Sequence, residues 1–211
     1  MLPQLLIFDL DGTLVDSRAD LAASINHMRD GYGLEALPQE VISGYIGSGA
    51  RDLVRRSLQG ADLQVDEALR VYKTHYDANL AVHTTTYPGV LEGIPKLAHA
   101  GQTLCVLSNK PGDACRAIMR HFGLDGYFTR IIGGGDLERL KPEPEGVITC
   151  LEATGMDAGQ AWMIGDHHTD LVVAKNAGVK SAYVSYGFGD RLDLEAVVNF
   201  ASFSDLVDYF V

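Results

Sequence analysis

Two carboxylates, Asp9 and Asp11, follow a short apolar run near the start of the chain. The run, residues 5–8, reads Leu-Leu-Ile-Phe, and it is typical of a strand that is buried on both faces. Residues two apart in an extended backbone point the same way, so we expect both carboxylates on one side. Gly12 allows a sharp turn directly after them. The two negative charges of such a pair repel each other, and burying them costs desolvation free energy. The pair therefore needs a cation or a shared proton. By itself the stretch fits two ordinary turn carboxylates equally well.

Polar side chains also follow two later strand-like stretches. Ser108 comes directly after residues 103–107, and Asp166 comes shortly after residues 161–164, with Asp170 one helical turn further on. The carboxyl ends of parallel strands meet at one edge of a sheet, where ligands bind in such folds. The groups that could meet at this edge are Asp9, Asp11, Ser108, Asn109, Lys141, Asp166 and Asp170.

This set of groups favours phosphoryl chemistry. Oxygen ligands without clustered thiolates suit a hard cation, most simply Mg²⁺, and Mg²⁺ suits a phosphoryl group. One carboxylate can attack phosphorus and form an aspartyl phosphate. A second carboxylate can protonate the leaving oxygen and later activate water. A lysine and amide donors can stabilise the phosphoryl oxygens.

The elements that must position these groups alternate along the chain. We expect strands over residues 5–8, 103–107, 130–132, 161–164 and 181–185. We expect helices over residues 90–100, 111–122, 144–154 and 169–177, and a helical tail from about residue 192. This alternation predicts an α/β fold with a Rossmann-like parallel sheet that is covered on both faces.

One segment behind the first strand departs from this alternation. It shows helical patterns over about 17–31, 38–46, 50–58 and 65–80, and no convincing strand. We therefore predict a small all-α domain over residues 16–82, inserted into an α/β core made of residues 1–15 and 83–211.

Composition excludes several classes of partner. The 211 residues are 46% hydrophobic and carry a formal net charge of −11, so we expect no binding to nucleic acid or to an anionic membrane. No apolar run is long enough to span a bilayer, and the apolar start lacks the basic region of a signal peptide. The three cysteines form no C-x-x-C pair, which favours buried free thiols and a cytoplasmic location. Both a monomer and a homodimer remain open.

In this order the motifs resemble the haloacid dehalogenase-like (HAD) hydrolase superfamily. The matching residues are Asp9-Leu10-Asp11-Gly12-Thr13, then Ser108, then Lys141, then Gly165-Asp166-x-x-x-Asp170. The match extends across the whole chain, and Asp11 separates it from the dehalogenases themselves, which use no metal. The resemblance implies a HAD-like Rossmann core, and it identifies the helical insertion as the small helical cap of this superfamily.

The resemblance also implies a role for each matching residue. Asp9 would be the nucleophile and Asp11 the general acid/base. Mg²⁺ would be held by the Asp9 carboxylate, the Asp11 backbone carbonyl and Asp166, with Asp170 in support. Ser108 would hydrogen-bond the phosphoryl group, and Lys141 would offset its charge.

Within the superfamily the chain looks most like the phosphoglycolate phosphatase group. Ser108-Asn109-Lys110-Pro111 is similar to the Thr-Asn-Lys-Pro stretch of that group, and Tyr45-Ile46-Gly47-Ser48-Gly49 is similar to its glycine-containing cap loop. This implies a Mg²⁺-dependent phosphomonoester hydrolase acting on a small phosphate ester, with 2-phosphoglycolate as the best candidate. The candidate substrate-binding residues are Thr13, Gly47, Arg51, Asn109 and Lys110.

Three alternatives remain open. The first is a phosphatase for another small sugar or metabolite phosphate, since such relatives share much of these motifs. The second is a phosphosugar mutase, against which Thr13 argues because those relatives lack threonine at that position. The third is a non-catalytic module that binds phosphate esters. The chain departs from the resemblance at His167-His168, where relatives commonly carry a small polar residue after the aspartate; a turn or a substrate contact is the expected role.

Overall fold

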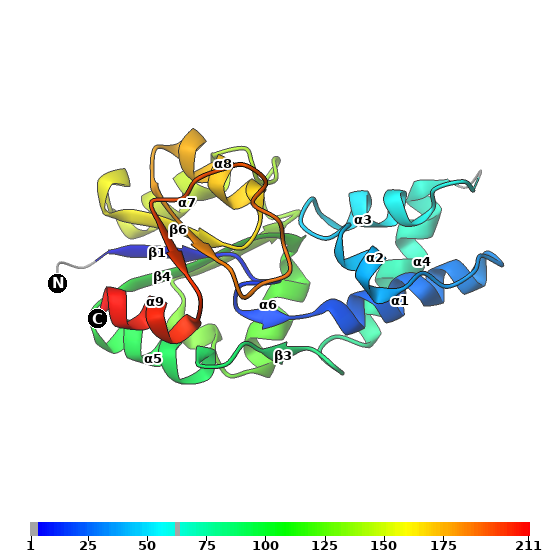
Figure 1. The fold of residues 1–211 in the computed structure, drawn as a ribbon, viewed down its shortest axis with the longest axis horizontal. Helices are drawn as coiled ribbons and strands as arrows, with labels where there is room; N and C mark the ends of the chain where they lie inside the picture. The colour runs from blue at the N-terminus through cyan, green and yellow to red at the C-terminus, as the bar shows by residue number, and fades with distance from the viewer. Residues whose placement is uncertain (1–3, 62–63) are drawn as a thin grey trace.

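A six-stranded sheet with all strands parallel forms the centre of the larger lobe in the computed structural model, which describes residues 4–61 and 64–211 (Figure 1). The strand order is β5 (Arg130–Gly134), β4 (Thr103–Pro111), β1 (Leu5–Phe8), β6 (Ala161–Gly165), β7 (Lys180–Val184) and β8 (Val198–Phe200). β1 and β6 lie in the middle of the sheet and pair along the whole of β1, from Leu5 opposite Ala161 to Phe8 opposite Ile164.

Helices cover both faces of the sheet, which explains why β1 is apolar throughout. Leu6 and Phe8 belong to the apolar cluster on the face covered by α5 (Val90–His99), α6 (Gly112–His121) and α9 (Phe203–Phe210). Leu5 and Ile7 belong to the cluster on the opposite face, covered by α7 (Glu145–Thr154) and α8 (His168–Ala177). Two single-turn helices, η1 (Asp125–Tyr127) and η2 (Ala158–Gln160), precede β5 and β6.

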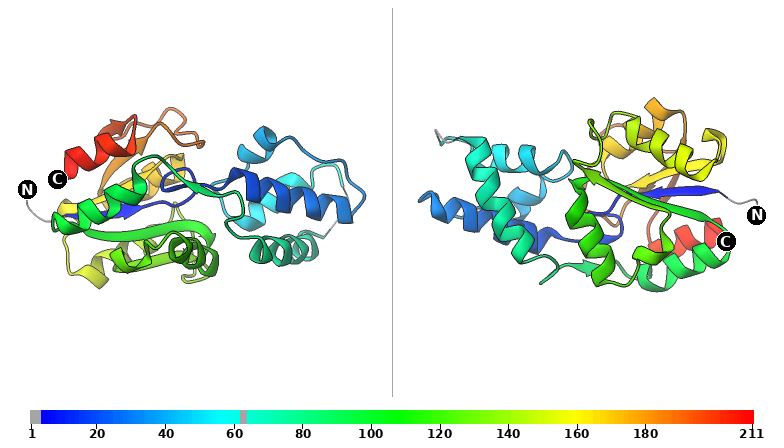
Figure 2. Two further views of the ribbon diagram at one scale, coloured as in Figure 1. Left: turned by 90° about the horizontal axis from the view of Figure 1, so that it is seen from below. Right: turned by 180° about the vertical axis from the view of Figure 1, so that it is seen from behind.

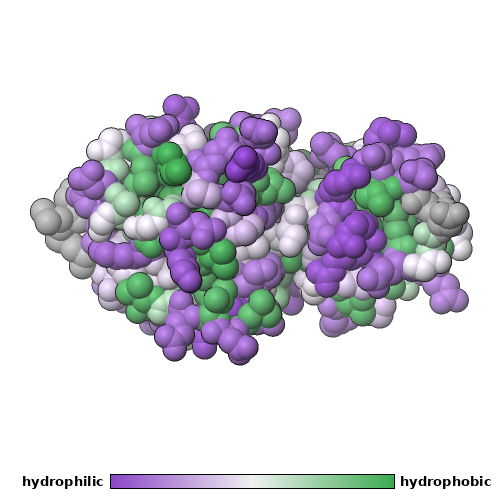
Figure 3. Space-filling model, turned by 90° about the horizontal axis from the view of Figure 1, so that it is seen from above, coloured by the Kyte–Doolittle hydropathy of each residue, from purple (hydrophilic) through white to green (hydrophobic). Residues whose placement is uncertain are grey.

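Four further helices form a smaller lobe, the helical insertion, at the end of the molecule opposite both chain termini (Figure 2). They pack around an apolar cluster of their own that includes Leu21, Ile25, Ile42, Val54 and Tyr72. Figure 3 shows the narrowing of the molecular surface between the two lobes. The helices are α1 (Arg18–Gly31), α2 (Gln39–Ser43), α3 (Ala50–Ser57) and α4 (Val65–Ala78).

The chain leaves and re-enters the larger lobe through a pair of short antiparallel strands. β2 (Val15–Asp16) pairs with β3 (Thr85–Thr86). Asp20, buried near the start of α1, accepts hydrogen bonds from the backbone N–H groups of His83 and Thr84, at 3.0 and 2.8 Å from Oδ2, and one from the Thr84 hydroxyl at 2.7 Å. The outgoing and returning segments are therefore fastened to each other.

The structure confirms the predicted fold class, a parallel α/β sheet flanked by helices. The predicted absence of strands also holds over residues 17–61 and 64–82, as far as the structure describes them. None of the helices in the described ranges combines the length and the apolar character that a membrane span requires. The three cysteines are free and buried, as predicted.

Several predicted boundaries are wrong, including those of β5, which extends to Gly134 and not only to residue 132, and α2, which ends at Ser43 and not at residue 46. The tail is not helical throughout, because residues 198–200 form β8 before α9 begins. β4 does not end at Leu107 but continues to Pro111, with an irregular register against β5 over that stretch. Pro111 is consequently the residue that precedes α6, not part of its first turn.

Candidate active site

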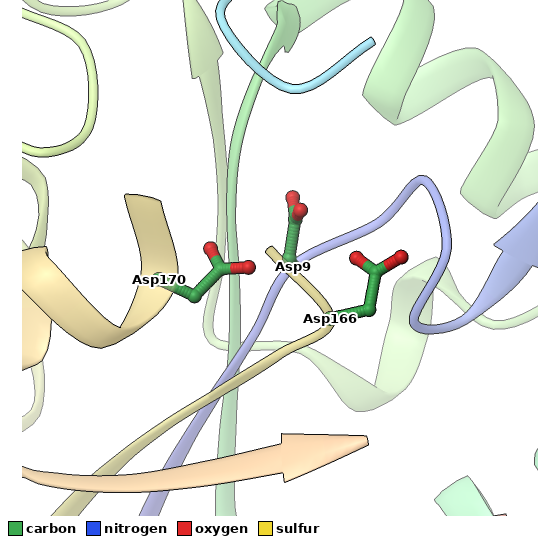
Figure 4. Close-up of side chains that lie close together, drawn as sticks. All are labelled: Asp9, Asp166 and Asp170. Carbon is green, nitrogen blue, oxygen red and sulfur yellow. The ribbon is translucent and has the colours of Figure 1, made fainter. Parts of the chain in front are cut away.

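Three buried aspartates meet at the carboxyl edge of the sheet. Asp9 directly follows β1, Asp166 directly follows β6, and Asp170 lies in the first turn of α8. Each offers a carboxylate oxygen, and these three oxygens lie within 4.8 Å of one another. In Figure 4 the Asp9 side chain stands between the other two. The backbone N–H of Asp9 donates to the Ile164 carbonyl at 2.9 Å, which fixes Asp9 against β6.

Lys141 neutralises part of this charge. Its Nζ lies 2.9 Å from Asp9 Oδ1 and donates to Asp170 Oδ1 at 2.7 Å. Asp170 Oδ2 accepts from the backbone N–H of His167 at 3.1 Å, so both oxygens of Asp170 have partners. Burial by itself would lower the pKa of Lys141, but the charges of Asp170 and then Asp9 raise that pKa above its usual value. The lysine is therefore a permanent cation, and Asp170 positions it.

Asp166 is held by a loop that follows β7. Its Oδ2 accepts from the backbone N–H groups of Phe188 at 3.0 Å and Gly189 at 2.7 Å. The turn after Asp11 closes on the same carboxylate: Gly12 has a φ of +85°, and a Cβ there would lie 1.9 Å from Asp166 Oδ2. Only glycine combines that backbone conformation with so close an approach. The chain thus places the loops after β1, β6 and β7 in mutual contact.

The three aspartates fit a hard divalent cation. Burial, then the charges of Asp9 and Asp170, raise the pKa of Asp166 well above its usual range. Burial likewise raises the pKa of Asp170, although the Lys141 charge opposes it. A nearby positive charge stabilises the ionised form of carboxylates whose pKa values are raised in this way. Carboxylate oxygens are the ligands that Mg²⁺ prefers, so the donor set agrees with the cation predicted from the sequence.

Asp11 belongs to a separate group, at the contact between the two lobes. Its Oδ1 accepts from the Ser17 hydroxyl at 2.5 Å, and Lys110 Nζ lies 3.1 and 3.0 Å from its two oxygens. The Lys110 side chain is only 3% exposed. Its Nζ also lies 4.7 Å from the centre of the Tyr76 ring, which comes from α4. Lys110 therefore links a carboxylate of the sheet edge to the helical insertion.

Asn109 holds two loops at once. Its Nδ2 donates to the carbonyl of Gly47, in the insertion loop before α3, and to the carbonyl of Lys141, each at 2.9 Å. Its Oδ1 accepts from the backbone N–H of Lys141 at 2.8 Å. The adjacent Ser108 is buried, with its Oγ 3.4 Å from the Lys110 backbone nitrogen. Asn109 is therefore a positioning residue for Lys141 and for the insertion loop.

A cavity lies between the lobes, with walls of different character. The larger lobe supplies mostly polar groups: Asp9, Asp11, Ser108, Asn109, Lys110, Asp166 and His167. The helical insertion supplies mostly apolar and aromatic side chains: Leu21, Ile46, Ala50, Leu53, Tyr72 and Tyr76, with Gly47 and Gly49. The carboxylates and the lysine thus lie on one wall, and the other wall is mostly apolar and aromatic.

A family model described as haloacid dehalogenase-like hydrolase matches residues 6–184. This chain belongs to that family. It is 36% identical over 218 residues to a phosphoglycolate phosphatase of Psychrobacter arcticus, with 98% of this chain and 95% of the relative covered. It is 35% identical over 199 residues to a phosphoglycolate phosphatase of Colwellia psychrerythraea, with 90% of this chain and 88% of the relative covered.

A solved structure of similar fold supports the same family. It is a crystal structure of a protein described as a predicted phosphoglycolate phosphatase, from Haemophilus somnus 129pt. The two structures align with a TM-score of 0.94 at 28% sequence identity, covering 99% of this chain and 98% of the other. The arrangement of both lobes in this hydrolase therefore has a counterpart in a relative of nearly equal length.

Two predicted substrate-binding residues of this hydrolase lie away from the cavity. Arg51 is bound to Asp66 at the surface, and its side chain is 63% exposed. Within the described residues, neither Arg51 nor Thr13 lines the cavity. The Thr13 carbonyl accepts from the Tyr186 hydroxyl at 2.9 Å, while its own hydroxyl makes no hydrogen bond to the described part of the chain. Thr13 therefore shapes the turn, and the structure does not place Arg51 near the other site residues.

The sequence did not reveal three other features of the hydrolase. The loop residues Phe188 and Gly189 anchor Asp166 through their backbones, and the Gly-Phe-Gly stretch after the last predicted strand was the only available signal. Tyr76 reaches Lys110 across the lobes, which no local pattern indicates. The rings of His167 and His168 contact each other, with their centres 4.0 Å apart, which no sequence pattern indicates.

Proposed function

We propose that this protein is a Mg²⁺-dependent phosphomonoester hydrolase that converts 2-phosphoglycolate to glycolate and phosphate through an aspartyl-phosphate intermediate. The observation that carries the proposal is that Asp9, Asp11 and Ser108 line one cavity, with Lys141 Nζ 2.9 Å from Asp9 Oδ1. A nucleophile, an acid/base, a hydroxyl donor and a cation are the groups that phosphoryl transfer through a covalent intermediate requires. The substrate is that of the curated relatives named above.

In the first step an Asp9 carboxylate oxygen attacks phosphorus, and the bond between phosphorus and the leaving-group oxygen breaks. Asp11 transfers a proton to that oxygen and becomes a carboxylate. In the second step Asp11 takes a proton from water as the water oxygen attacks phosphorus. The bond from phosphorus to Asp9 then breaks, which releases phosphate and restores both aspartates. In both steps Ser108 donates a hydrogen bond to a phosphoryl oxygen, and Lys141 offsets the charge on phosphate and Asp9.

Mg²⁺ would be held by the Asp9 carboxylate, the Asp11 backbone carbonyl and Asp166. It would neutralise phosphoryl charge and orient the phosphate. Asp170 supports this site by holding Lys141, since its two oxygens are already hydrogen-bonded.

Lys110 is the residue we propose for the carboxylate of the substrate. Of the described residues that line the cavity, it is the one lysine or arginine. Burial disfavours its charge, but the neighbouring Asp11 and then Tyr76 raise the pKa of Lys110 overall, so it is a cation at neutral pH. A substrate carboxylate at Lys110 would take over the contact that Asp11 makes and leave Asp11 free to reach the ester oxygen. Gly47 and Asn109 border the same part of the cavity.

Residues 16–82 are proposed to act as a cap domain over a core of residues 1–15 and 83–211. The support is the cavity wall that the helical insertion supplies and the hydrogen bond from Asn109 to Gly47 across the two lobes. Closing such a lid excludes water from the reacting phosphate.

The test is phosphate release from a panel of phosphomonoesters, measured with Mg²⁺ and with chelator, for the wild type and Asp9→Asn. We expect chelator-sensitive turnover with the highest kcat/KM on 2-phosphoglycolate, and a loss of at least about 10³-fold in the variant. Asp113→Asn is the matched control, because Asp113 is fully exposed and pairs with Arg116 at the surface.

Each other outcome contradicts a different part of the proposal. Highest kcat/KM on a sugar phosphate would replace the substrate and keep the mechanism. Isomerised ester with little free phosphate would indicate a mutase. Tight ester binding without turnover would indicate a binding module. Full activity of Asp9→Asn would contradict the covalent mechanism.

A further inference from the structure

His167 occupies the boundary between the two lobes inside the cavity. It lies directly after Asp166 and precedes α8 as its N-cap residue. Its backbone N–H donates to Asp170 Oδ2 at 3.1 Å, so the carboxylate that holds Lys141 also fixes the backbone of His167. The side chain lines the cavity, although neither the mechanism nor the proposed cation site uses it.

The orientation of the His167 ring is determined by one of its two nitrogens. Nδ1 accepts from the backbone N–H of Thr169 at 3.4 Å and lies 3.0 Å from the Thr169 hydroxyl oxygen. The ring also contacts that of His168, with the ring centres 4.0 Å apart and the ring planes tilted by 41°. A neutral histidine that accepts at Nδ1 carries its proton on Nε2. The opposite edge of the ring, Cε1 and Nε2, therefore presents an N–H donor.

That edge meets the insertion loop at Gly47. A Cβ at Gly47 would lie 2.7 Å from both Cε1 and Nε2 of His167, a distance that real Cβ atoms essentially never show. The loop is held in this position because the Gly47 carbonyl accepts from Asn109 Nδ2 at 2.9 Å. The ring and the loop are thus in contact, and both line the cavity.

We propose that His167 determines the size of the leaving group that this enzyme accepts. Its ring takes up the space between the phosphoryl site at Asp9 and the insertion loop, so leaving groups of two or three carbons fit and pentose or hexose leaving groups collide with it. This inference rests on the proposed phosphatase function and adds the residue that selects among esters.

The test compares two substrates within one enzyme preparation. His167→Ser removes the ring but keeps a good N-cap side chain for α8, so Asp166 and Asp170 retain their supports. The measured quantity is kcat/KM for glucose 6-phosphate divided by kcat/KM for 2-phosphoglycolate. This ratio does not depend on the fraction of folded enzyme. We expect it to rise at least about tenfold, the discrimination that a few apolar contacts supply.

His168→Ser is the matched control, because His168 carries the same side chain one residue further on and is not among the described residues that line the cavity. We expect it to change the ratio less than about threefold, since its ring contacts His167 and does not line the cavity. His167→Asn, which also caps a helix well, serves as a second variant with a small side chain and is expected to raise the ratio as His167→Ser does.

Three results would overturn the inference. An unchanged ratio in both His167 variants would show that the ring does not limit the leaving group. An equal rise of the kcat/KM ratio in His168→Ser would show that the effect comes from loosening of the first turn of α8 and not from removal of the His167 ring. Wild-type enzyme that releases phosphate from no ester would overturn the proposed function itself, and this inference with it.

Discussion

The two buried lysines of the candidate site differ in what surrounds them. Lys141 contacts Asp9 and Asp170, and all three residues belong to the larger lobe. Lys110 contacts Asp11 from the same lobe but also the ring of Tyr76 from the helical insertion. One cation is thus enclosed by the sheet edge alone, and the other is enclosed only where the two lobes meet.

This difference separates two tasks. In the proposed mechanism the groups around Lys141 act on the phosphate, which is common to every ester, and the charged partners of Lys141 all belong to the larger lobe. The groups around Lys110 are proposed to face the leaving group, which varies, and their surroundings include the insertion. A change at Lys141 should therefore affect all substrates alike, whereas a change at Lys110 should affect substrates unequally. The following predictions test that separation, from the largest effect to the smallest.

Lys141→Met should lower kcat by about 10²–10³-fold on every phosphomonoester, because the phosphoryl charge loses its fixed cation. The unfolding free energy should also fall, by about 3–5 kcal/mol, because the substitution leaves Asp9 and Asp170 buried without their partner. Steady-state kinetics and denaturant unfolding measure the two effects.

Lys96→Met is the control for Lys141→Met, since Lys96 pairs with Asp208 at the surface and its side chain is 54% exposed. It should change neither quantity measurably. If Lys141→Met lost activity on 2-phosphoglycolate alone, Lys141 would affect substrates unequally, as is expected of Lys110. That result would contradict the proposed difference between the two lysines.

Gly12→Ala should raise the Mg²⁺ concentration for half-maximal activity by about 10–100-fold, the range for residues that orient metal ligands. The added Cβ would displace the Asp166 carboxylate, which it would approach to 1.9 Å. Gly33→Ala in the helical insertion is the matched control: Gly33 also has a positive φ, +68°, but a Cβ there meets nothing within 4 Å.

Both glycine variants carry similar backbone strain, so only the contact with Asp166 separates them. If Gly33→Ala changed the Mg²⁺ requirement as much as Gly12→Ala, general destabilisation would explain the effect, and the sheet edge would not be independent of the insertion.

Lys110→Met should raise KM for 2-phosphoglycolate at least about tenfold relative to KM for p-nitrophenyl phosphate, whose leaving group carries no carboxylate. The comparison between two substrates cancels any shared effect of moving Asp11. Equal increases in KM for both esters would mean that Lys110 acts only through Asp11 and does not recognise the leaving group.

The smallest effect concerns the insertion alone. Burial, then the charge of His27, lowers the pKa of His75, whose ring stacks on that of His27. A lowered pKa means that the folded state binds fewer protons. The resulting stability is complete above the unfolded pKa of about 6.5 and is lost as pH falls below it. His75→Gln should reduce the loss of Tm between pH 7 and pH 5.5 by about 1–2 °C.

Calorimetry at the two pH values measures this effect, and His99→Gln, on α5 of the larger lobe, is the control. An identical pH dependence in wild type and His75→Gln would show that the histidine pair does not contribute. A changed kcat in His75→Gln would show that the insertion influences the sheet edge more than the structure indicates.

Residues next to strongly apolar strands were the most predictable part of the site. Asp9 and Asp166 follow runs that are buried on both faces, and such runs are recognisable from their composition alone, so both carboxylates could be assigned to one edge of the sheet. β8 was not predictable in the same way. It has only three residues, it lies at the edge of the sheet where one side is unpaired, and its middle residue Asn199 is exposed. Short edge strands leave little pattern in a sequence.

Contacts between distant residues are the part of the site that the sequence did not indicate. Lys110 and Asp11 are 99 positions apart, and no local pattern indicates their pairing. Arg51 lies next to the glycine-containing loop in sequence, but its side chain points to Asp66 at the surface. Sequence spacing predicts which face of an element a residue occupies, and packing between elements decides which partner it meets.

The fastening of the two crossing segments has a consequence for how such proteins diversify. Val15 pairs with Thr86, Asp16 pairs with Thr85, and Asp20 binds the backbone of the returning segment. Because the insertion begins and ends at adjacent points, its interior can be lengthened, shortened or exchanged for an unrelated fold without altering the separation of its two ends. The paired segments therefore form a fixed connection to which different insertions can be attached. A new range of substrates can then evolve while the larger lobe and its catalytic residues stay unchanged.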